Sequence, residues 1–155
     1  MAEFTHIQDG RAQMVDISNK GEVVREATAS GRIYLRPETL AAIRDGKVVK
    51  GNVLATARVA ATLAVKNTAN IIPMCHPIPI SSIAVDFTDH EGYIETTVVV
   101  KMTGRTGVEM EALTGVSVAL LTVWDMVKSA EKDSAGQYPV TRITDIRVVE
   151  KKKGK

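Results

Sequence analysis

The chain has 155 residues, of which 45% are apolar and 25% charged, and its formal net charge at pH 7 is +2. This length suits one domain that buries its own core, and the composition excludes a disordered or fibrous chain. A single cysteine excludes an intrachain disulfide, no apolar run approaches the roughly 20 residues of a membrane span, and no basic-then-apolar signal segment opens the chain. We therefore expect one cytoplasmic domain over residues 1–155, with no membrane attachment.

Both ends of the chain are polar, so we predict that residues 1–20 and 151–155 are flexible. The second segment, KKKGK, is the one conspicuous basic run. A solvated end is the favoured interpretation and a phosphate-binding arm is the alternative. A net charge this close to zero argues against nucleic acid as a partner, because nucleic-acid binding needs a strongly basic surface.

The first half of the chain predicts extended structure followed by two helices. VVREA (23–27) and again RIYLR (32–36) are rich in β-formers and are predicted as strands. PETLAAIRDG (37–46) has proline in the first turn and glycine at the end of a short predicted helix. Asn52 is a good N-cap for a second helix, VLATARVAATLAVK (53–66), whose alanines permit close packing.

The second half predicts a hairpin, a long helix and a last strand. Residues 81–103 form two alternating runs around a turn at DHEG (89–92). The segment from about 107 to 132 has no proline and carries an apolar stripe at helical spacing, and PVTRITDIRVVE (139–150) follows as a strand. The order β, α, α, β, β, α, β predicts an α+β fold: a ferredoxin-like variant with a largely antiparallel sheet and helices packed on one face.

Asp125 and Lys128 are three residues apart in the long predicted helix and therefore share a face. The ordinary interpretation is a solvated surface pair, which contributes little. The pair adjoins Trp124 and a mostly apolar stretch, where partial burial would lower the pKa of a lysine or raise that of a carboxylic acid. Acid/base chemistry is therefore the second interpretation.

Two segments near predicted helix starts favour ligand binding without settling it. Lys50 precedes Gly51 and a helix start, where an ammonium is able to hold an anion, although lone lysines are usually only solvated. Glu109 and Glu111 would repel a phosphate and suit hydrogen bonds to a base or hydroxyl better. Because residues two apart on a helix point about 200° from each other, either the helix begins after Glu109 or the two face different surroundings, and we favour the first.

IIPMCHPIPI (71–80) places Cys75 beside His76 among three prolines. Adjacent side chains of an extended segment point to opposite faces, which argues against a nucleophile and base pair. No second cysteine or histidine lies at ligand spacing, so we expect no metal site. Because the prolines fix the backbone around it, we interpret the segment as a stiff ledge that presents His76, with a buried structural histidine as an equal alternative.

Several motifs together resemble the cyclic pyranopterin monophosphate synthase family, which acts in the first stage of molybdenum cofactor biosynthesis. They are MVDIS with VVREATASG, KGNVLATARVAATLAVKNTANIIPMCHPIPI and TGRTGVEMEALTGVSVALLTVWDMVKSAEKD. The similarity extends from about Thr5 to Val149, and the cysteine-histidine-proline block and GVEMEALT are its most specific parts. Asn52, where many relatives carry Asp, is the nearest to a departure, and a helix cap tolerates either residue.

The resemblance implies a single catalytic domain, a phosphorus-oxygen lyase that converts 3′,8-cyclo-7,8-dihydro-GTP into cyclic pyranopterin monophosphate and pyrophosphate. It implies catalytic roles for Asp125, Lys128, Lys50 and His76. The substrate-binding positions that it implies are Met74, Cys75, His76, Met110, Glu111, Glu109, Arg25 and Lys66. It also implies a hexamer built from dimers and no resident cofactor, and leaves open whether Mg²⁺ accompanies the triphosphate.

Helix geometry adds an expectation about assembly. Glu111 and Asp125 are 14 positions apart, about 21 Å along a helix at roughly 1.5 Å per residue, and Lys50 and Lys66 flank another helix of similar length. One small substrate cannot easily reach both ends of these helices within one chain. We therefore predict a site at a subunit interface, with opposite helix ends contributed by different chains.

Two other classes of protein stay open as alternatives. A non-catalytic, oligomeric ligand-binding or regulatory α+β domain predicts that replacing Asp125 or Lys128 changes neither affinity nor any rate. A small nucleic-acid binder using the basic tail predicts salt-dependent affinity that disappears when residues 151–155 are removed. The aromatic content of 4% and the near-neutral charge make the second alternative the weaker one.

Overall fold

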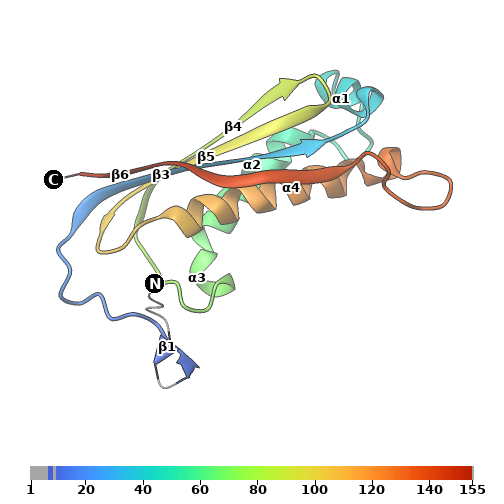
Figure 1. Cartoon of the computed structure of the whole chain (residues 1–155). Helices are drawn as coiled ribbons and strands as arrows, with labels where there is room; N and C mark the ends of the chain where they lie inside the picture. The colour runs from blue at the N-terminus through green and yellow to red at the C-terminus, as the bar shows by residue number, and fades with distance from the viewer. Residues whose placement is uncertain (1–6, 9, 155) are drawn as a thin grey trace.

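The computed structural model describes residues 7–8 and 10–154. Its body is a four-stranded antiparallel sheet in the order β4-β5-β3-β6, with α2 and α4 against one face (Figure 1). The bounds are β3 Val23–Tyr34, α1 Pro37–Arg44, α2 Val53–Lys66, α3 Thr68–Ile71, β4 Ile80–His90, β5 Tyr93–Gly104, α4 Glu109–Glu131 and β6 Arg142–Lys153. This is the ferredoxin-like β-α-β-β-α-β arrangement, which confirms the predicted α+β class.

The structure has a helix cap and two glycine turns at the positions that the local sequence predicted. Asn52 caps α2, and its side-chain oxygen accepts a hydrogen bond from the Ala55 N–H at 3.0 Å. Gly46 ends α1 with a φ of 68°, and Gly92 closes the β4–β5 hairpin with a φ of 87°. These positive φ values are the reason that glycine stands at both positions.

Strand β3 runs unbroken through the two segments that were predicted separately. It pairs with β5 without a register shift from Val23, opposite Gly104, to Tyr34, opposite Tyr93. Ala29, Ser30 and Gly31, which link the two segments, are buried. Gly31 lies against Val116 and Leu120 of α4, so its lack of a side chain lets the helix lie close over the middle of the strand, which propensity alone does not predict.

The prediction of a flexible C-terminal end is wrong for residues 151–154. Lys151 and Lys153 lie in β6 opposite Ala27 and Arg25 of β3, and the Gly154 N–H donates to the Val24 carbonyl at 2.7 Å. The residues of this segment are exposed, but their backbone pairs with β3 at the edge of the sheet. Of the N-terminal prediction, residues 1–6 and 9 lie outside the described residues, while β1 (Ile7–Gln8) and β2 (Arg11–Ala12) pair as a separate hairpin (Figure 1).

Helix α4 is the central element of the core. Its buried face includes Val116, Leu120 and Val123, each fully buried, which belong to one core cluster with Val98 and Ile33 of the sheet. Contrary to the sequence expectation, α4 is long and apolar enough to span a membrane by length and composition alone. More than half of its most apolar stretch is buried inside the fold, as in the core helix of a globular domain.

A methyl group at Gly31 should destabilise the fold. A Cβ there would lie 2.8 Å from Val116 Cγ1, 2.9 Å from Leu120 Cδ1 and 3.1 Å from Ile146 Cγ1. We expect Gly31→Ala to lower the free energy of unfolding by about 1–3 kcal/mol, measured by urea denaturation, because a packed core resists added volume. Gly21→Ala is the control, since a Cβ there meets nothing within 4 Å; equal stabilities of the two variants would contradict the close packing of α4 on β3.

Candidate active site

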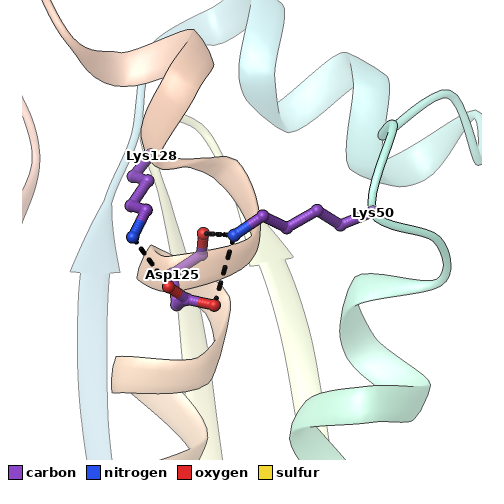
Figure 2. A network of polar contacts seen from close by, with 3 residues as sticks. All are labelled: Lys50, Asp125 and Lys128. Carbon is purple, nitrogen blue, oxygen red and sulfur yellow. Dashed lines mark hydrogen bonds and ion pairs between the residues drawn. The ribbon is translucent and has the colours of Figure 1, made fainter.

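Near the C-terminal end of α4, the Asp125 carboxylate lies between two lysines (Figure 2). Lys128 Nζ is 3.0 Å from Asp125 Oδ1, and Lys50 Nζ is 3.3 Å from Oδ2. Lys50 Nζ also donates to the Asp125 backbone carbonyl at 2.9 Å. We call these three residues the lysine–aspartate cluster.

Local structure explains how distant segments meet in this cluster. Lys128 follows Asp125 by three residues on α4, so the two share one face of the helix. Lys50 arrives from the loop before α2, where Gly51 adopts a φ of 110° that suits glycine. The start of α2 therefore lies beside the end of α4.

The electrostatics of the cluster differ from the expectation of partial burial. The Asp125 and Lys128 side chains are 61% and 44% exposed. Hydrogen bonds from Lys128 and then Lys50 lower the pKa of Asp125, and the hydrogen bond to Asp125 raises the pKa of Lys128. Both pKa shifts favour the charged forms, so Asp125 and Lys128 form an ion pair rather than a neutral acid/base pair.

The other sequence-predicted residues gather at the opposite end of the two helices, around a cavity of about 220 Å³ that we call the ledge pocket. It is lined by Val15, Ile17, Lys20, Met74, Cys75, His76, Thr106, Gly107, Glu109, Met110 and Glu111. A smaller cavity of about 110 Å³ shares His76 and Glu111 and extends to Lys66 at the end of α2. His76 is only partly buried and lines both cavities, so the alternative of a buried structural histidine is wrong.

Burial favours the neutral forms of two groups in the ledge pocket. Glu111 is 4% exposed, and burial raises its pKa to about 7, with a smaller contribution from the charge of Glu109. Burial, and then the charge of Glu111, also raises the pKa of the Cys75 thiol. A thiol with a raised pKa is a poor nucleophile, which agrees with a non-nucleophilic Cys75.

Glu109 and Glu111 face different surroundings, although both belong to α4. The helix begins at Glu109, so the favoured interpretation, a start after Glu109, is wrong. Burial alone would raise the pKa of Glu109, but Lys151 Nζ lies 2.5 Å from its carboxylate and the net effect lowers it. Its carboxylate also lies over Gly107, where a Cβ would clash with it.

Arg25 joins the ledge-pocket end of the molecule. Its side chain donates from Nε to the Gly104 carbonyl at 3.2 Å, and its charge helps to lower the pKa of Glu109. The predicted residues thus form two groups separated by most of the length of α4, about 21 Å from Glu111 to Asp125. Within one chain, the structure does not bring them into one pocket.

A further cavity lies away from both groups of residues. It has a volume of about 280 Å³ and is lined by Leu40, Ile43, Arg44, Leu54, Phe87, Asp89 and Ile94. Apart from the Arg44–Asp89 ion pair, its lining is apolar, so it lacks converging polar groups for chemistry. Within residues 7–8 and 10–154, no group of three or more His, Cys, Asp or Glu side chains is arranged to hold a metal ion.

Sequence reasoning missed several residues of the ledge pocket. Val15, Ile17 and Lys20 come from the segment that includes MVDIS, which carried the family resemblance but was assigned no contact. The contact of Lys151 with Glu109, which lines the pocket, was also missed, because residues 151–155 were predicted to be flexible. The sequence shows the basic segment and the two glutamates but not their pairing.

The molecule is a ferredoxin-like domain with ionisable side chains at both ends of α2 and α4, and comparisons with known proteins identify it as a member of an enzyme family. The model of the MoaC family matches residues 14–154. Proteins named probable cyclic pyranopterin monophosphate synthase are 79% identical in Methanoregula boonei, over 99% of both chains, and 58% identical in Pyrococcus abyssi, over 97% of this chain and 95% of the relative. The chain belongs to the MoaC family, so the resemblance read from the motifs is confirmed.

The raised pKa of Glu111 predicts a pH dependence of stability. Unfolded glutamate titrates near pH 4.3, so from there to about pH 7 the folded state holds a proton that the unfolded state has lost, and stability falls as pH rises. Between pH 5.5 and 8, the free energy of unfolding, measured with urea, should fall by roughly 2 kcal/mol less in Glu111→Gln than in the wild type. Glu109→Gln is the control, because its lowered pKa places its titration below this range; parallel curves for wild type and Glu111→Gln would contradict a buried neutral acid.

Proposed function

We propose that this protein is a cyclic pyranopterin monophosphate synthase, a lyase that converts 3′,8-cyclo-7,8-dihydro-GTP into cyclic pyranopterin monophosphate and pyrophosphate. The observation that carries the proposal is the lysine–aspartate cluster, which forms from Lys50, Asp125 and Lys128, three of the residues for which the resemblance implies catalysis. The printed name of the relatives and their identity over nearly the whole chain support it. The reaction yields pterin for the molybdenum cofactor.

The residues fit the demands of this reaction. A triphosphate carries several negative charges, which Arg25, Lys50 and Lys66 would offset together with charge developing on the leaving pyrophosphate. Ring opening and pterin formation need proton transfers, for which Asp125 and Lys128 are the proposed acid/base pair. A ribose hydroxyl then attacks the α-phosphate, its proton passes to a base, and the bond to pyrophosphate breaks.

The ledge pocket is the proposed site for the purine-derived rings. Met74, Cys75 and Met110 supply soft, weakly polar surface, and His76 supplies ring nitrogens for hydrogen bonding. Glu111, with its pKa at about 7, offers a carboxylic O–H as well as an acceptor near neutral pH. Such a pocket recognises a polar ring by hydrogen bonds while leaving the phosphates to the cations.

We further propose that each complete site forms between two copies of the chain. Exposed apolar side chains lie between the two groups of polar residues: Val59 and Leu63 on α2 are 61% and 54% exposed, and Leu121 on α4 is 57% exposed. A two-fold axis across this surface would cover them and place the lysine–aspartate cluster of one copy beside the ledge pocket of the other. Covering Asp125 and Lys128 would also remove water from them, as acid/base chemistry near neutral pH requires.

The remaining parts of the proposal concern assembly and surroundings. Two-fold dimers of this kind would associate into a hexamer that acts in the cytoplasm on a small purine-derived triphosphate. No resident cofactor is needed for the steps above, and Mg²⁺ would enter with the triphosphate if at all. Neither nucleic acid nor a membrane has a part in this reaction.

Removing one member of the acid/base pair should abolish turnover without unfolding the protein. Purified wild type, supplied without oxygen with freshly generated cyclic dihydro-GTP, should release pyrophosphate and form pterin. Asp125→Ala and Lys128→Ala should each fall by at least about 100-fold in kcat, because proton transfer by a positioned group contributes that much. Circular dichroism and the oligomeric state should match the wild type, because neither side chain belongs to the core of the fold.

The matched control is Lys101→Ala, a lysine 52% exposed on the open face of the sheet. It should retain wild-type turnover. A folded, oligomeric wild type without turnover would overturn the proposed function and leave the ligand-binding alternative, and near-normal turnover by Lys128→Ala would remove that residue from catalysis.

A site shared between copies predicts that two inactive variants restore each other. In a mixed dimer of Asp125→Ala and His76→Ala, one of the two sites takes both intact residues from different chains. After the two proteins are unfolded and refolded together, about a quarter of wild-type activity should return, since half of randomly formed dimers are mixed. Separately refolded proteins mixed afterwards without exchange are the control, and no recovery in the co-refolded sample would place each site within one chain.

A further inference from the structure

One ionisable side chain, outside both the lysine–aspartate cluster and the ledge pocket, is fully buried and surrounded by hydrogen-bond donors. Glu131, the last residue of α4, is 0% exposed. Its carboxylate accepts hydrogen bonds from the Thr39 hydroxyl, from the Thr141 hydroxyl at 2.7 Å and from the Arg36 backbone N–H at 3.2 Å to each oxygen. A carboxylate with this many donors in a dry site holds its neighbours in one geometry.

The contacts around Glu131 join two helix ends reciprocally. The start of α1 has no side-chain cap of its own, and the Glu131 carboxylate supplies negative charge and acceptors there. In return, the Arg36 guanidinium donates to the Glu131 backbone carbonyl at 3.3 Å, at the end of α4. We call this arrangement the α4–α1 junction.

The α4–α1 junction lies next to both segments that form the lysine–aspartate cluster, the end of α4 and the loop that carries Lys50. On α4, Lys128 precedes Glu131 by three residues, within one turn. On the other side, α1 leads into the loop that carries Lys50, and this loop is fastened to α1 by the Lys47 N–H, which donates to the Ala42 carbonyl at 2.9 Å. A turn from the Val48 carbonyl to the Gly51 N–H, at 3.0 Å, encloses Lys50.

We propose that Glu131 is a positioning residue, which fixes the end of α4 relative to α1 and thereby sets the distance between Lys50 and the Asp125–Lys128 pair. The Lys50 contact is the one that depends on this junction, because Lys50 is the only member of the cluster that is not on α4. The position of Lys50 rests on the fold alone, whereas its effect on rate rests on the proposed function. Glu131 touches no reacting atom.

The test compares an apolar and a conservative replacement. Glu131→Met keeps the length of the side chain but removes every acceptor, whereas Glu131→Gln keeps one acceptor oxygen. Thr141→Val is a milder second variant, which removes one donor to Glu131 and replaces Glu131→Met in the test if that variant does not fold. Val98→Ala, in the sheet core and fully buried, is the control for loss of stability without a change at the junction.

The first readout needs no activity: an NMR titration of the Asp125 carboxyl. Lys50 and Lys128 are the charged groups that face Asp125, and Tyr138 in turn faces Lys128. In Glu131→Met or Thr141→Val, Lys50 should move away from Asp125. Without this contact the Asp125 pKa should rise toward the ordinary value of an aspartic acid. Glu131→Gln should lie close to wild type, and Val98→Ala should match it.

The second readout is kinetic. Glu131→Met should lower kcat by roughly 10- to 100-fold with KM changed less, since small displacements of positioned groups cost that much, and Glu131→Gln should recover most of it. An unchanged Asp125 titration in folded Glu131→Met and Thr141→Val would overturn the positioning role. A wild type without turnover would instead overturn the proposed function, and the titration would still decide the role of Glu131.

Discussion

The close antiparallel packing of α2 on α4 is the constraint on which the site depends. Ala57, Ala61 and Ala64 are the buried small residues of α2 on which this packing relies, and Gly115 of α4 lies so near Val65 that an added Cβ would be 2.7 Å from its Cγ2. Small side chains at a helix contact shorten the distance between the axes. Because the two helices run in opposite directions, the start of each meets the end of the other, and every candidate residue falls into one of two groups.

The two groups differ in their protonation for physical reasons that belong to their places in the fold. Exposure and mutual contact keep Asp125 and Lys128 charged, whereas burial raises the pKa of Glu111 to about 7 and so favours its neutral form in weak acid. A change of surroundings that displaces water from an exposed ion pair weakens its preference for the charged forms. A partner copy and a bound substrate would do so, which links assembly and chemistry in the proposed enzyme.

Local patterns predicted most of the fold. In the site they predicted individual residues but not the partners that those residues contact from distant segments. Asn52 as a helix cap and the turn ending at Gly92 follow from short-range rules, and the spacing of Asp125 and Lys128 predicted their shared face. What the sequence could not give was long-range pairing. Lys50 lies 75 residues from Asp125, and the pairing of Lys151 with Glu109 depends on a strand that was predicted as a loose end. The buried state of Glu111 likewise depends on neighbours from other segments.

Both ends of the described chain contribute to the ledge pocket, and this explains why the whole chain is needed to form it. Val15 and Ile17 are half-buried against it, although their segment has no regular structure, and Lys151 at the far end of β6 holds Glu109. Neither segment has a core of its own, so each is ordered by what it packs against. The sheet pairs β6 with β3, and α4 packs against both strands. In this arrangement the acidic start of α4 and the segment from Met74 to His76 line a common cavity. The pocket is thus a product of the completed topology rather than of any one motif.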